Sequence, residues 1–299
     1  MQMGMIGLGK MGGNMVKRLI AAGHAVVAFD LDDEHLRAAA SDGAVAARSV
    51  PDLVEKLAKP RAVWVMVPHG EPTTSTIDTL LEHLDRDDAI VDGGNSRYVD
   101  SVAAAERCGR QGVHFLDAGV SGGVWGLEEG YCLMVGGPEA AFKQIEPVFA
   151  ALAPDGGYAR VGASGAGHFV KMVHNAIEYA MLQALGEGFE CLYRSDFELD
   201  LEQVAELWRH GAVVRSWLLD LLAQAFAKEG TALPHVAGYV ADSGMGRWSV
   251  EYAVEHAIPI PVITQSLYER FQSRLDERFS AKVIAALRDQ FGGHGMKRS

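Results

Sequence analysis

The stretch MIGLGKMGGNM, residues 5–15, decides the fold of the first half of this chain. Its glycines Gly7, Gly9 and Gly12 have the spacing G-x-G-x-x-G, which is a weak signal when it stands alone. Here an apolar strand pattern precedes the motif and a helical pattern follows it to Ile20. That context is the one a dinucleotide-binding turn requires. The alternative is a glycine-rich turn that binds no nucleotide.

Each glycine of this motif has a physical reason in a nucleotide-binding turn. The first permits the tight turn, the second lets the backbone approach a pyrophosphate at a helix N-terminus, and the third permits close packing of helix on strand. The next strand ends in Asp30, whose carboxylate can accept hydrogen bonds from ribose hydroxyls and would repel a 2′-phosphate. Because Leu31, Asp32 and Asp33 follow and no arginine does, the pattern favours NAD over NADP.

Further short apolar runs alternate with helical patterns as far as Gly162. The runs that resemble strands are HAVVAFD, RAVWVMVP, DAIVDGG, VHFLDAG, YCLMVGG and YARVG. Strands that alternate with helices predict a parallel sheet. Beyond Gly162 the chain shows one helical pattern after another and no clear strand run. The sequence therefore predicts an α/β Rossmann-like domain over residues 1–162, followed by an all-α domain over residues 163–299.

Three turns that follow predicted strands are candidates for ligand contact. VPHG, residues 67–70, is expected near the adenosine or the linker of the cofactor, and Asn95 would lie at the carboxyl end of the sheet, where ligands bind in open α/β folds. GVSGGVWG, residues 119–126, offers backbone amides and a hydroxyl for a carboxylate, although a flexible loop is the alternative. The expected cofactor contacts are Gly7, Leu8, Gly9, Lys10, Met11, Gly12, Asp30, Val67, Pro68, His69 and Asn95.

The composition narrows the class of protein. The 299 residues are 48% hydrophobic and 22% charged, with a net charge of −12, which argues against nucleic acid and anionic membranes as partners. Three scattered cysteines without a CxxC pair favour a reducing compartment, so a cytoplasmic location is expected. We expect no membrane span and no signal peptide, because no apolar run is long enough and no basic leader precedes the first strand. The scattered histidines predict no metal site, and LDRDD, residues 84–88, predicts a solvated turn.

A polar stripe runs through KMVHNAIEYA, residues 171–180. Its members lie on one face of a helix with apolar flanks, at the spacing i, i+3, i+4 and i+7: Lys171, His174, Asn175 and Glu178. Lys171 and Glu178 would be separated by about 10 Å along the axis, so they could serve opposite sides of a small substrate. Burial would lower the pKa of the lysine and allow it to act as a base. The alternative is a buried polar network between helices.

The stripe lies within a longer pattern. GASGAGHFVKMVHN, residues 162–175, resembles the G-x-x-G-x-G-x-x-x-K-x-x-x-N signature of the β-hydroxyacid dehydrogenases. The continuation HNAIEY, together with DGGNSRY, VSGG and the tail segment RDQFGGH (residues 288–294), is similar to the decarboxylating 6-phosphogluconate dehydrogenase branch, in a short form without the second set of helices.

The resemblance implies an oxidative decarboxylation and a role for each matching residue. Lys171 would take the proton of the 3-hydroxyl, and Glu178 would later protonate carbon 1 to give ribulose 5-phosphate. The resemblance also implies substrate contacts from Asn95, Ser121, Gly122, Gly123, His174 and Asn175, phosphate contacts from Tyr179 and Arg270, and contacts from Arg288 and His294 in the site of a neighbouring subunit. A homodimer or tetramer is therefore expected.

One segment departs from the family pattern. The long form has a phosphate-contacting lysine before its G-T-G-K-W segment, whereas this chain reads ADSGMGRWSV and has no lysine there, with Arg247 at the position of the final lysine. Two alternatives stay open. A β-hydroxyacid dehydrogenase for a substrate such as 3-hydroxyisobutyrate would explain Lys171 but not Glu178 or the tail, and a non-catalytic NAD-binding sensor would bind cofactor without turnover.

Overall fold

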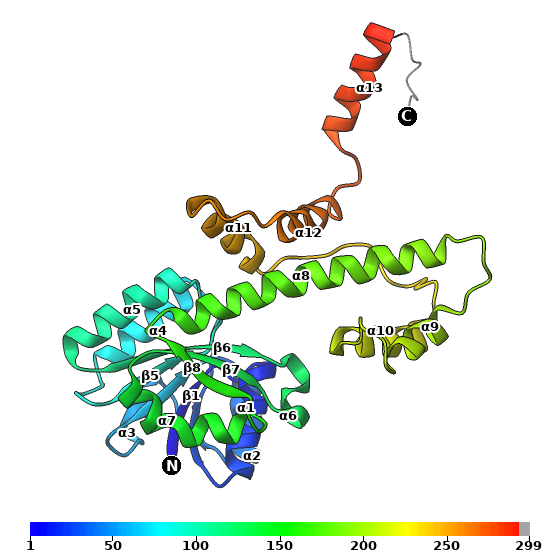
Figure 1. The fold of residues 1–299 in the computed structure, drawn as a ribbon. Coiled ribbons are helices and arrows are strands. Elements are labelled where there is room, and N and C mark those ends of the chain that lie inside the picture. The colour runs from blue at the N-terminus through cyan, green and yellow to red at the C-terminus, as the bar shows by residue number, and fades with distance from the viewer. Residues whose placement is uncertain (293–299) are drawn as a thin grey trace. The chain divides into compact units, whose positions relative to one another are not determined.

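The computed structural model describes residues 1–292, with side chains as far as residue 290. The chain divides into two compact units, Met1–Asn175 and Ala176–Ser299 (Figure 1). The long helix α8 (Ala166–Tyr193) runs through this division. The domain boundary predicted at residue 162 stays a prediction.

The first unit is organised around an eight-stranded sheet in the order β3-β2-β1-β4-β5-β6-β7-β8. Its neighbouring strands are parallel except for β6 and β7, which are antiparallel. The strand order reverses direction between β1 and β4, which is the switch point where open α/β sheets bind ligands. The strands are β1 (Gln2–Ile6), β2 (Ala25–Phe29), β3 (Val45–Ala46), β4 (Ala62–Val65), β5 (Ala89–Asp92), β6 (His114–Ser121), β7 (Cys132–Gly136) and β8 (Tyr158–Gly162).

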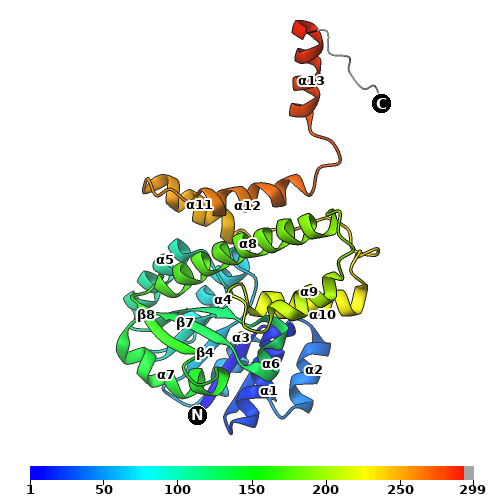
Figure 2. The same ribbon diagram turned by 45° about the vertical axis from the view of Figure 1, so that its right-hand side comes forward.

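Helices cover both faces of this sheet (Figure 2). Met3 and Met5 of β1 belong to a core that includes residues of α1 and α7, whereas Gly4 faces Leu53 of α3 and the opposite core. Such alternation is what a strand buried on both faces requires. The helices of the first unit are α1 (Lys10–Ala21), α2 (Asp33–Ser41), α3 (Val50–Glu55), α4 (Glu71–Leu81), α5 (Tyr98–Gln111), α6 (Gly126–Glu129) and α7 (Glu139–Leu152).

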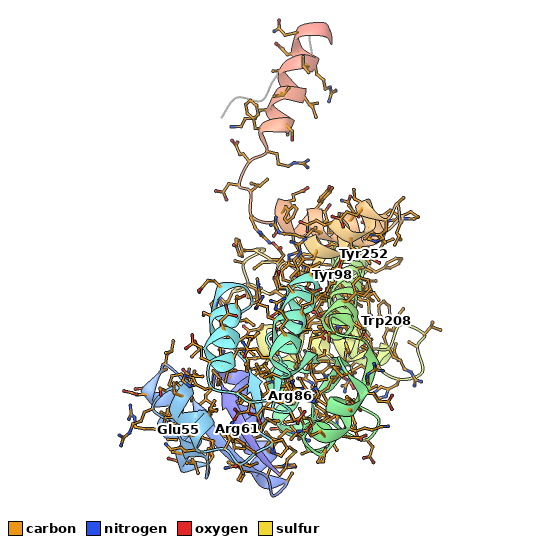
Figure 3. The ribbon with its side chains drawn as sticks, turned by 90° about the vertical axis from the view of Figure 1, so that its left-hand side faces the viewer. Glu55, Arg61, Arg86, Tyr98, Trp208 and Tyr252 are labelled. Carbon is orange, nitrogen blue, oxygen red and sulfur yellow. The ribbon has the colours of Figure 1, made fainter. Side chains whose placement is uncertain are left out.

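The described part of the second unit contains helices and connecting segments but no assigned strand. A small core forms where α8, α9 and α10 meet, with Trp208 packed edge-on against Phe189 at 5.5 Å between ring centroids (Trp208 is labelled in Figure 3). The α/β domain followed by helices is therefore confirmed. After α8 the helices are α9 (Leu201–Trp208), α10 (Trp217–Glu229), α11 (Met245–Glu255), α12 (Pro261–Gln272) and α13 (Phe279–Gly292). None of the helices in residues 1–292 has the length and hydropathy needed to cross a membrane.

The prediction of a solvated turn at residues 84–88 is wrong for its first and last residues, since Leu84 and Asp88 are both buried. Asp88 is 1% exposed, and its carboxylate accepts hydrogen bonds from the backbone N–H and the guanidinium of Arg61, at 2.6 and 3.0 Å (Arg61 is labelled in Figure 3). Burial is tolerated here because the charge is paired and hydrogen-bonded. The partner lies at the start of β4, so local composition could not predict it.

Candidate active site

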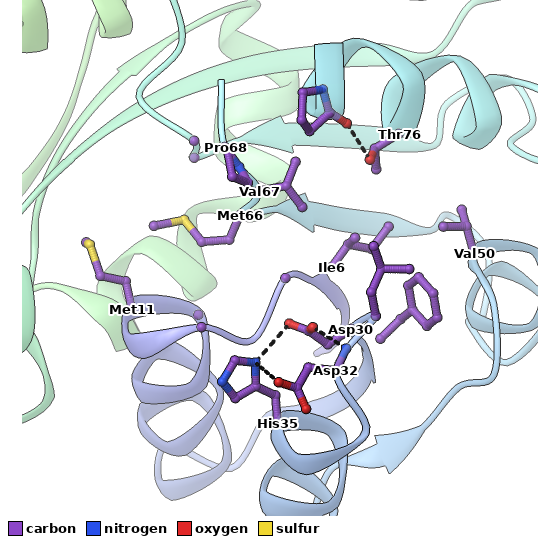
Figure 4. A pocket seen from close by; sticks show the side chains of 18 of the residues that line it. Ile6, Met11, Asp30, Asp32, His35, Val50, Met66, Val67, Pro68 and Thr76 are labelled. Carbon is purple, nitrogen blue, oxygen red and sulfur yellow. Dashed lines mark hydrogen bonds and ion pairs between the residues drawn. The ribbon is translucent and has the colours of Figure 1, made fainter. Parts of the chain in front are cut away.

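A cavity of about 1390 Å³ lies at the carboxyl ends of β1, β2 and β4, at the switch point of the sheet (Figure 4). The predicted cofactor contacts that line it are Gly7, Gly9, Lys10, Met11, Gly12, Asp30, Val67, Pro68 and Asn95. Leu8 and His69 are not among the lining residues, and Leu8 is buried. The sequence reasoning missed His35 and Met66, together with a row of α4 residues from Glu71 to Thr79.

The three glycines of the first turn have different surroundings. A Cβ on Gly12 would lie 2.0 Å from the carbonyl oxygen of Gly7, and one on Gly7, whose φ is +91°, would lie 2.4 Å from that of Met66. A Cβ on Gly9 would meet no atom within 4 Å. Gly9 is also the N-cap of α1, and it lines the cavity together with Lys10 and Met11, so the N-terminus of this helix faces the cavity. The geometry fits a pyrophosphate held by backbone N–H groups.

Carboxylates gather at the end of β2. Asp30 accepts hydrogen bonds from the backbone N–H groups of Leu8, at 2.5 Å, and Asp32, at 2.8 Å, so it ties the glycine turn to β2. Nδ1 of His35 lies 3.6 Å from a carboxylate oxygen of Asp30 and 4.0 Å from one of Asp32 (Figure 4). With Asp33 also on the lining, this end of the cavity is acidic. It suits hydroxyl donors better than a phosphate.

Asn95 is held in place by its own amide. Its Oδ1 accepts a hydrogen bond from the backbone N–H of Val120 at 3.0 Å, and its Nδ2 donates to the carbonyl of Val120 at 3.3 Å. The residue adopts a left-handed conformation with φ of +53°, which asparagine tolerates better than most residues. The pairing joins the turn after β5 to the end of β6. One amide hydrogen and one oxygen lone pair stay available for a ligand.

Beyond β6, the backbone turns sharply at the second glycine-rich segment. Ser121 is the last residue of β6, and Gly122 and Gly123 have φ values of +128° and +54°, followed by a short 3₁₀ turn, Gly123–Trp125. Arg18 of α1 donates to the carbonyl of Leu127 at 2.9 Å, which anchors the far side of this loop to the helix that starts at the glycine turn.

The start of α8 is fixed by a buried carboxylate. Asp117 of β6 is fully buried and accepts hydrogen bonds from the backbone N–H groups of Gly165, at 2.6 Å, and His168, at 2.8 Å. These N–H groups belong to the first turn of the helix, where a negative charge is favourable. His168 is itself buried, and its Nδ1 lies 2.7 Å from the hydroxyl of Ser101.

The glycines of the G-x-x-G-x-G-x-x-x-K-x-x-x-N segment let this helix approach the sheet. A Cβ on Gly167 would lie 2.3 Å from the carbonyl oxygen of Asp117, and one on Gly119 would lie 2.4 Å from Cβ of Lys171. Lys171 is 4% exposed. A lysine so deeply buried is uncommon, and the missing side chain at Gly119 provides the space for it.

The stripe lies on one continuous helix. His174 and Asn175 are half-buried and hydrogen-bonded to each other, Nδ1 to Oδ1 at 3.0 Å, and Glu178 is also half-buried. The structure therefore places all four predicted polar residues on α8, with Lys171, His174 and Asn175 in the first unit and Glu178 in the second.

The remaining predicted contacts belong to the second unit. Tyr179 is 4% exposed, and its ring lies 3.4 Å from Cζ of Arg270, while its hydroxyl accepts from the backbone N–H of Ser243 at 2.9 Å. The structure thus brings Tyr179 and Arg270 together. Arg288 is exposed on α13, and His294 lies outside the described residues. In residues 1–292, no group of three or more His, Cys, Asp or Glu side chains could hold a metal ion.

This fold and site define the class of Rossmann-fold dehydrogenases: a glycine turn at the switch point, followed by a buried lysine on the first helix after the sheet. Two family models match the chain, the NAD binding domain of 6-phosphogluconate dehydrogenase over residues 2–163 and the C-terminal domain of 6-phosphogluconate dehydrogenase over residues 193–299. The chain belongs to the 6-phosphogluconate dehydrogenase family of oxidoreductases.

Individual relatives agree with this assignment. The chain is 51% identical over its full length, and over 99% of the relative, to an NAD(+)-dependent, decarboxylating 6-phosphogluconate dehydrogenase of Haloferax volcanii. It is 34% identical to the NADP(+)-dependent enzyme of Bacillus subtilis, over 92% of this chain and 62% of that one. The solved 6-phosphogluconate dehydrogenase of Plasmodium falciparum has a TM-score of 0.84 at 26% identity, over 100% of this chain and 66% of that one.

Proposed function

We propose that this protein catalyses the NAD-dependent oxidative decarboxylation of 6-phosphogluconate to ribulose 5-phosphate and carbon dioxide. The observation that carries the proposal is a lysine buried against Gly119, with a carboxylate two turns further along the same helix. A simple hydroxyacid oxidation needs the lysine alone. A second proton donor is required only when a carbanion-like intermediate must be protonated after decarboxylation.

The roles of the two residues follow from their chemistry. Lys171, in its neutral form, takes the proton of the 3-hydroxyl, while bound NAD would accept the hydride from carbon 3. The resulting 3-keto acid loses its carboxylate as carbon dioxide, and protonated Lys171 then donates a hydrogen bond to the keto oxygen and stabilises the enolate. Glu178 protonates carbon 1 of this enolate, which gives ribulose 5-phosphate.

The other proposed contacts orient the substrate. His174 and Asn175 are paired with each other and would present their remaining donors and acceptors to the hydroxyl groups. Asn95, together with Ser121, Gly122 and Gly123, would bind the carboxyl and hydroxyl end. Tyr179 and Arg270 would bind the phosphate, because a tyrosine hydroxyl and a guanidinium are both suitable donors for its oxygens.

The preference for NAD is proposed from the acidic end of the cavity. Asp30, Asp32 and Asp33 line this end, and in the described residues no arginine lines the cavity. A 2′-phosphate would therefore meet carboxylates without a guanidinium to neutralise it. Relatives at about one third identity do not decide the question, since the Bacillus subtilis enzyme at 34% is NADP(+)-dependent.

Self-association is part of the proposal. Helix α13 carries exposed apolar side chains on neighbouring turns, Phe279, Ile284 and Leu287, and the exposed Arg288 follows them. A second copy of the chain would cover these side chains, and Arg288 and His294 would then reach the phosphate of the neighbouring site. Light scattering on the full chain should give the mass of a dimer or tetramer, and a monomer at micromolar concentration would contradict this part of the proposal.

The test is the stoichiometry of the reaction. Initial NADH formation from 6-phosphogluconate is measured with NAD, then with NADP, while carbon dioxide is trapped. Equal amounts of NADH and carbon dioxide, with NAD preferred, are expected. Reduction without carbon dioxide would remove the role of Glu178. Turnover of 3-hydroxyisobutyrate but not 6-phosphogluconate would favour the simpler dehydrogenase, and cofactor binding without turnover of either would favour a sensor.

A further inference from the structure

The second unit gathers three arginines around one carboxylate. Asp242 accepts from Nε of Arg247 at 2.7 Å and from Nη2 of Arg274 at 2.5 Å, and its side chain is 4% exposed. Arg270, by contrast, has no carboxylate within 4.0 Å in the described part of the chain. Asp242 therefore supplies one negative charge to the two guanidiniums that it binds, and in the described part of the chain no carboxylate neutralises the charge of Arg270.

The same carboxylate lies in the middle of a turn that is anchored on both sides. Before Asp242, Arg270 donates to the carbonyl of Ala241 at 2.8 Å, and Arg274 donates to that of Val240 at 3.2 Å. Immediately after it, Ser243 donates its backbone N–H to the hydroxyl of Tyr179 at 2.9 Å, with its own Oγ at 3.1 Å from that hydroxyl.

The turn allows little freedom beyond these contacts. Gly244 has a φ of +89°, and helix α11 begins at the next residue. A Cβ on Gly246 would lie 2.8 Å from Cε2 of Tyr179, so the start of this helix packs directly on the tyrosine ring. A small displacement of the turn would therefore move Ser243, Tyr179 and Arg270 together.

We propose that Asp242 is a positioning residue for the phosphate of the substrate. By holding Arg247 and Arg274, it fixes the turn so that Ser243 and Tyr179 meet and Arg270 presents a guanidinium that no carboxylate of the described residues neutralises. This inference rests on the proposed function. It assigns to the Asp242–Arg274 pair the selectivity for a phosphorylated sugar acid over an unphosphorylated one.

Charge and geometry predict opposite results when Asp242 is changed. Asp242→Asn removes a negative charge from beside three cations, so charge alone predicts tighter binding of an anionic substrate. If Asp242 acts by position, the freed arginines shift the turn and binding weakens despite the extra positive charge. The sign of the change in KM for 6-phosphogluconate therefore separates the two explanations.

The experiment measures KM for 6-phosphogluconate, KM for NAD, and kcat in the wild type and Asp242→Asn. KM for the sugar acid is expected to rise about tenfold or more, which corresponds to about 1.4 kcal/mol, while KM for NAD is unchanged and kcat changes much less. Asp276→Asn is the matched control, because Asp276 is exposed and makes no ion pair in residues 1–290. A KM for the sugar acid that stays constant or falls would overturn the proposal.

A second variant covers the case in which Asp242→Asn does not fold. Arg274→Lys keeps the charge but loses the planar guanidinium, which donates at the same time to Asp242 and to the carbonyl of Val240. We expect KM for the sugar acid to rise several-fold, and an unaltered KM would contradict the inference. If the wild type does not turn over 6-phosphogluconate at all, both the proposed function and this inference fail. If the wild type does turn it over and the variants have the same KM as the wild type, the inference alone fails.

Discussion

The cofactor cavity is shaped by backbone atoms, whereas the arginine cluster is shaped by side chains. This cluster comprises Arg247, Arg270 and Arg274 with the carboxylate of Asp242. The cavity in Met1–Asn175 is shaped by backbone, because its turn contains Gly7 and Gly12, whose neighbours leave no space for a Cβ. The cluster in Ala176–Ser299 is shaped by side chains, with one carboxylate shared by two guanidiniums. The first should therefore respond to added volume. The second should respond to charge, pH and the length of a side chain.

The largest effect is expected on helix α8, whose residues belong to both units. Lys171→Met should lower turnover by about 10³-fold or more, because a general base contributes about 10²–10⁴, and it should leave NAD affinity intact. Assays of NADH formation, with calorimetric titration of NAD, check this. Lys143→Met is the control, since Lys143 is an exposed lysine paired with Glu139. Near-normal turnover in Lys171→Met would remove the assigned base.

Two glycine variants test whether volume alone governs the cavity. Gly12→Ala places a methyl group against the carbonyl of Gly7 and should lower the free energy of unfolding by about 2 kcal/mol. Gly9→Ala points its methyl into open space, so stability should change by less than about 0.5 kcal/mol, while the Kd for NAD rises. Urea unfolding and NAD titration measure both. Equal effects of the two substitutions on stability would contradict the explanation that the cavity responds to added volume.

Asp30 is the one place where the cavity should respond to charge. Asp30→Ala removes the carboxylate that follows β2 and should reduce the NAD-to-NADP ratio of kcat/KM about tenfold, a change of about 1.4 kcal/mol. Glu34→Ala is the control and should have a smaller effect, because Glu34 is an exposed carboxylate in the first turn of α2 that does not line the cavity. Steady-state kinetics with both cofactors decide the outcome. A ratio that does not move would mean that the cofactor preference arises elsewhere.

The smallest effect concerns acid stability of the arginine cluster. Hydrogen bonds from Arg247, and then from Arg274, hold the pKa of the Asp242 carboxyl well below its usual range, although burial opposes this. Because the folded pKa is depressed, the stabilisation is fully present above the unfolded pKa of about 4 and is lost as pH falls below it.

Urea unfolding at several pH values measures this stabilisation. At pH 7 the free energy of unfolding of the wild type should exceed that of Asp242→Asn by about 1 kcal/mol, the typical net contribution of a hydrogen bond. The difference should narrow below about pH 4. A difference that is constant between pH 7 and pH 3 would show that the carboxylate charge does not stabilise the turn.

Much of the cavity could be predicted from the sequence because its determinants are local. Gly7, Gly9 and Gly12 lie within six residues of one another, and Asp30 directly follows the next strand, β2. Both patterns can be recognised without knowledge of the rest of the chain. The strand β3 was missed because Val45–Ala46 is too short to show a period. His35 was missed because a histidine in the first turn of a helix is no signal until the strand before it is known to end at a cavity.

The arginine cluster could not be predicted, because its partners are distant in sequence. Asp242 and Arg274 lie on separate elements, and nothing in ADSGMGRWSV or YERFQSRLDER specifies that they meet. The same holds for Asp88 and Arg61. The resemblance did indicate Tyr179 and Arg270, but it gave no reason for Ser243, whose contact with Tyr179 depends on the path of the turn.

The anchoring of α8 by Asp117 has a consequence for how this chain can be altered in length. Each residue of a helix turns by about 100°, so one residue inserted between His168 and Lys171 would rotate the Lys171 side chain away from Gly119 while Asp117 still holds the helix start. An insertion in the exposed loop at residues 154–156 lies ahead of that anchor and leaves the number of residues between His168 and Lys171 unchanged. The chain can therefore be lengthened in that loop without turning Lys171, whereas a residue added between His168 and Lys171 turns it.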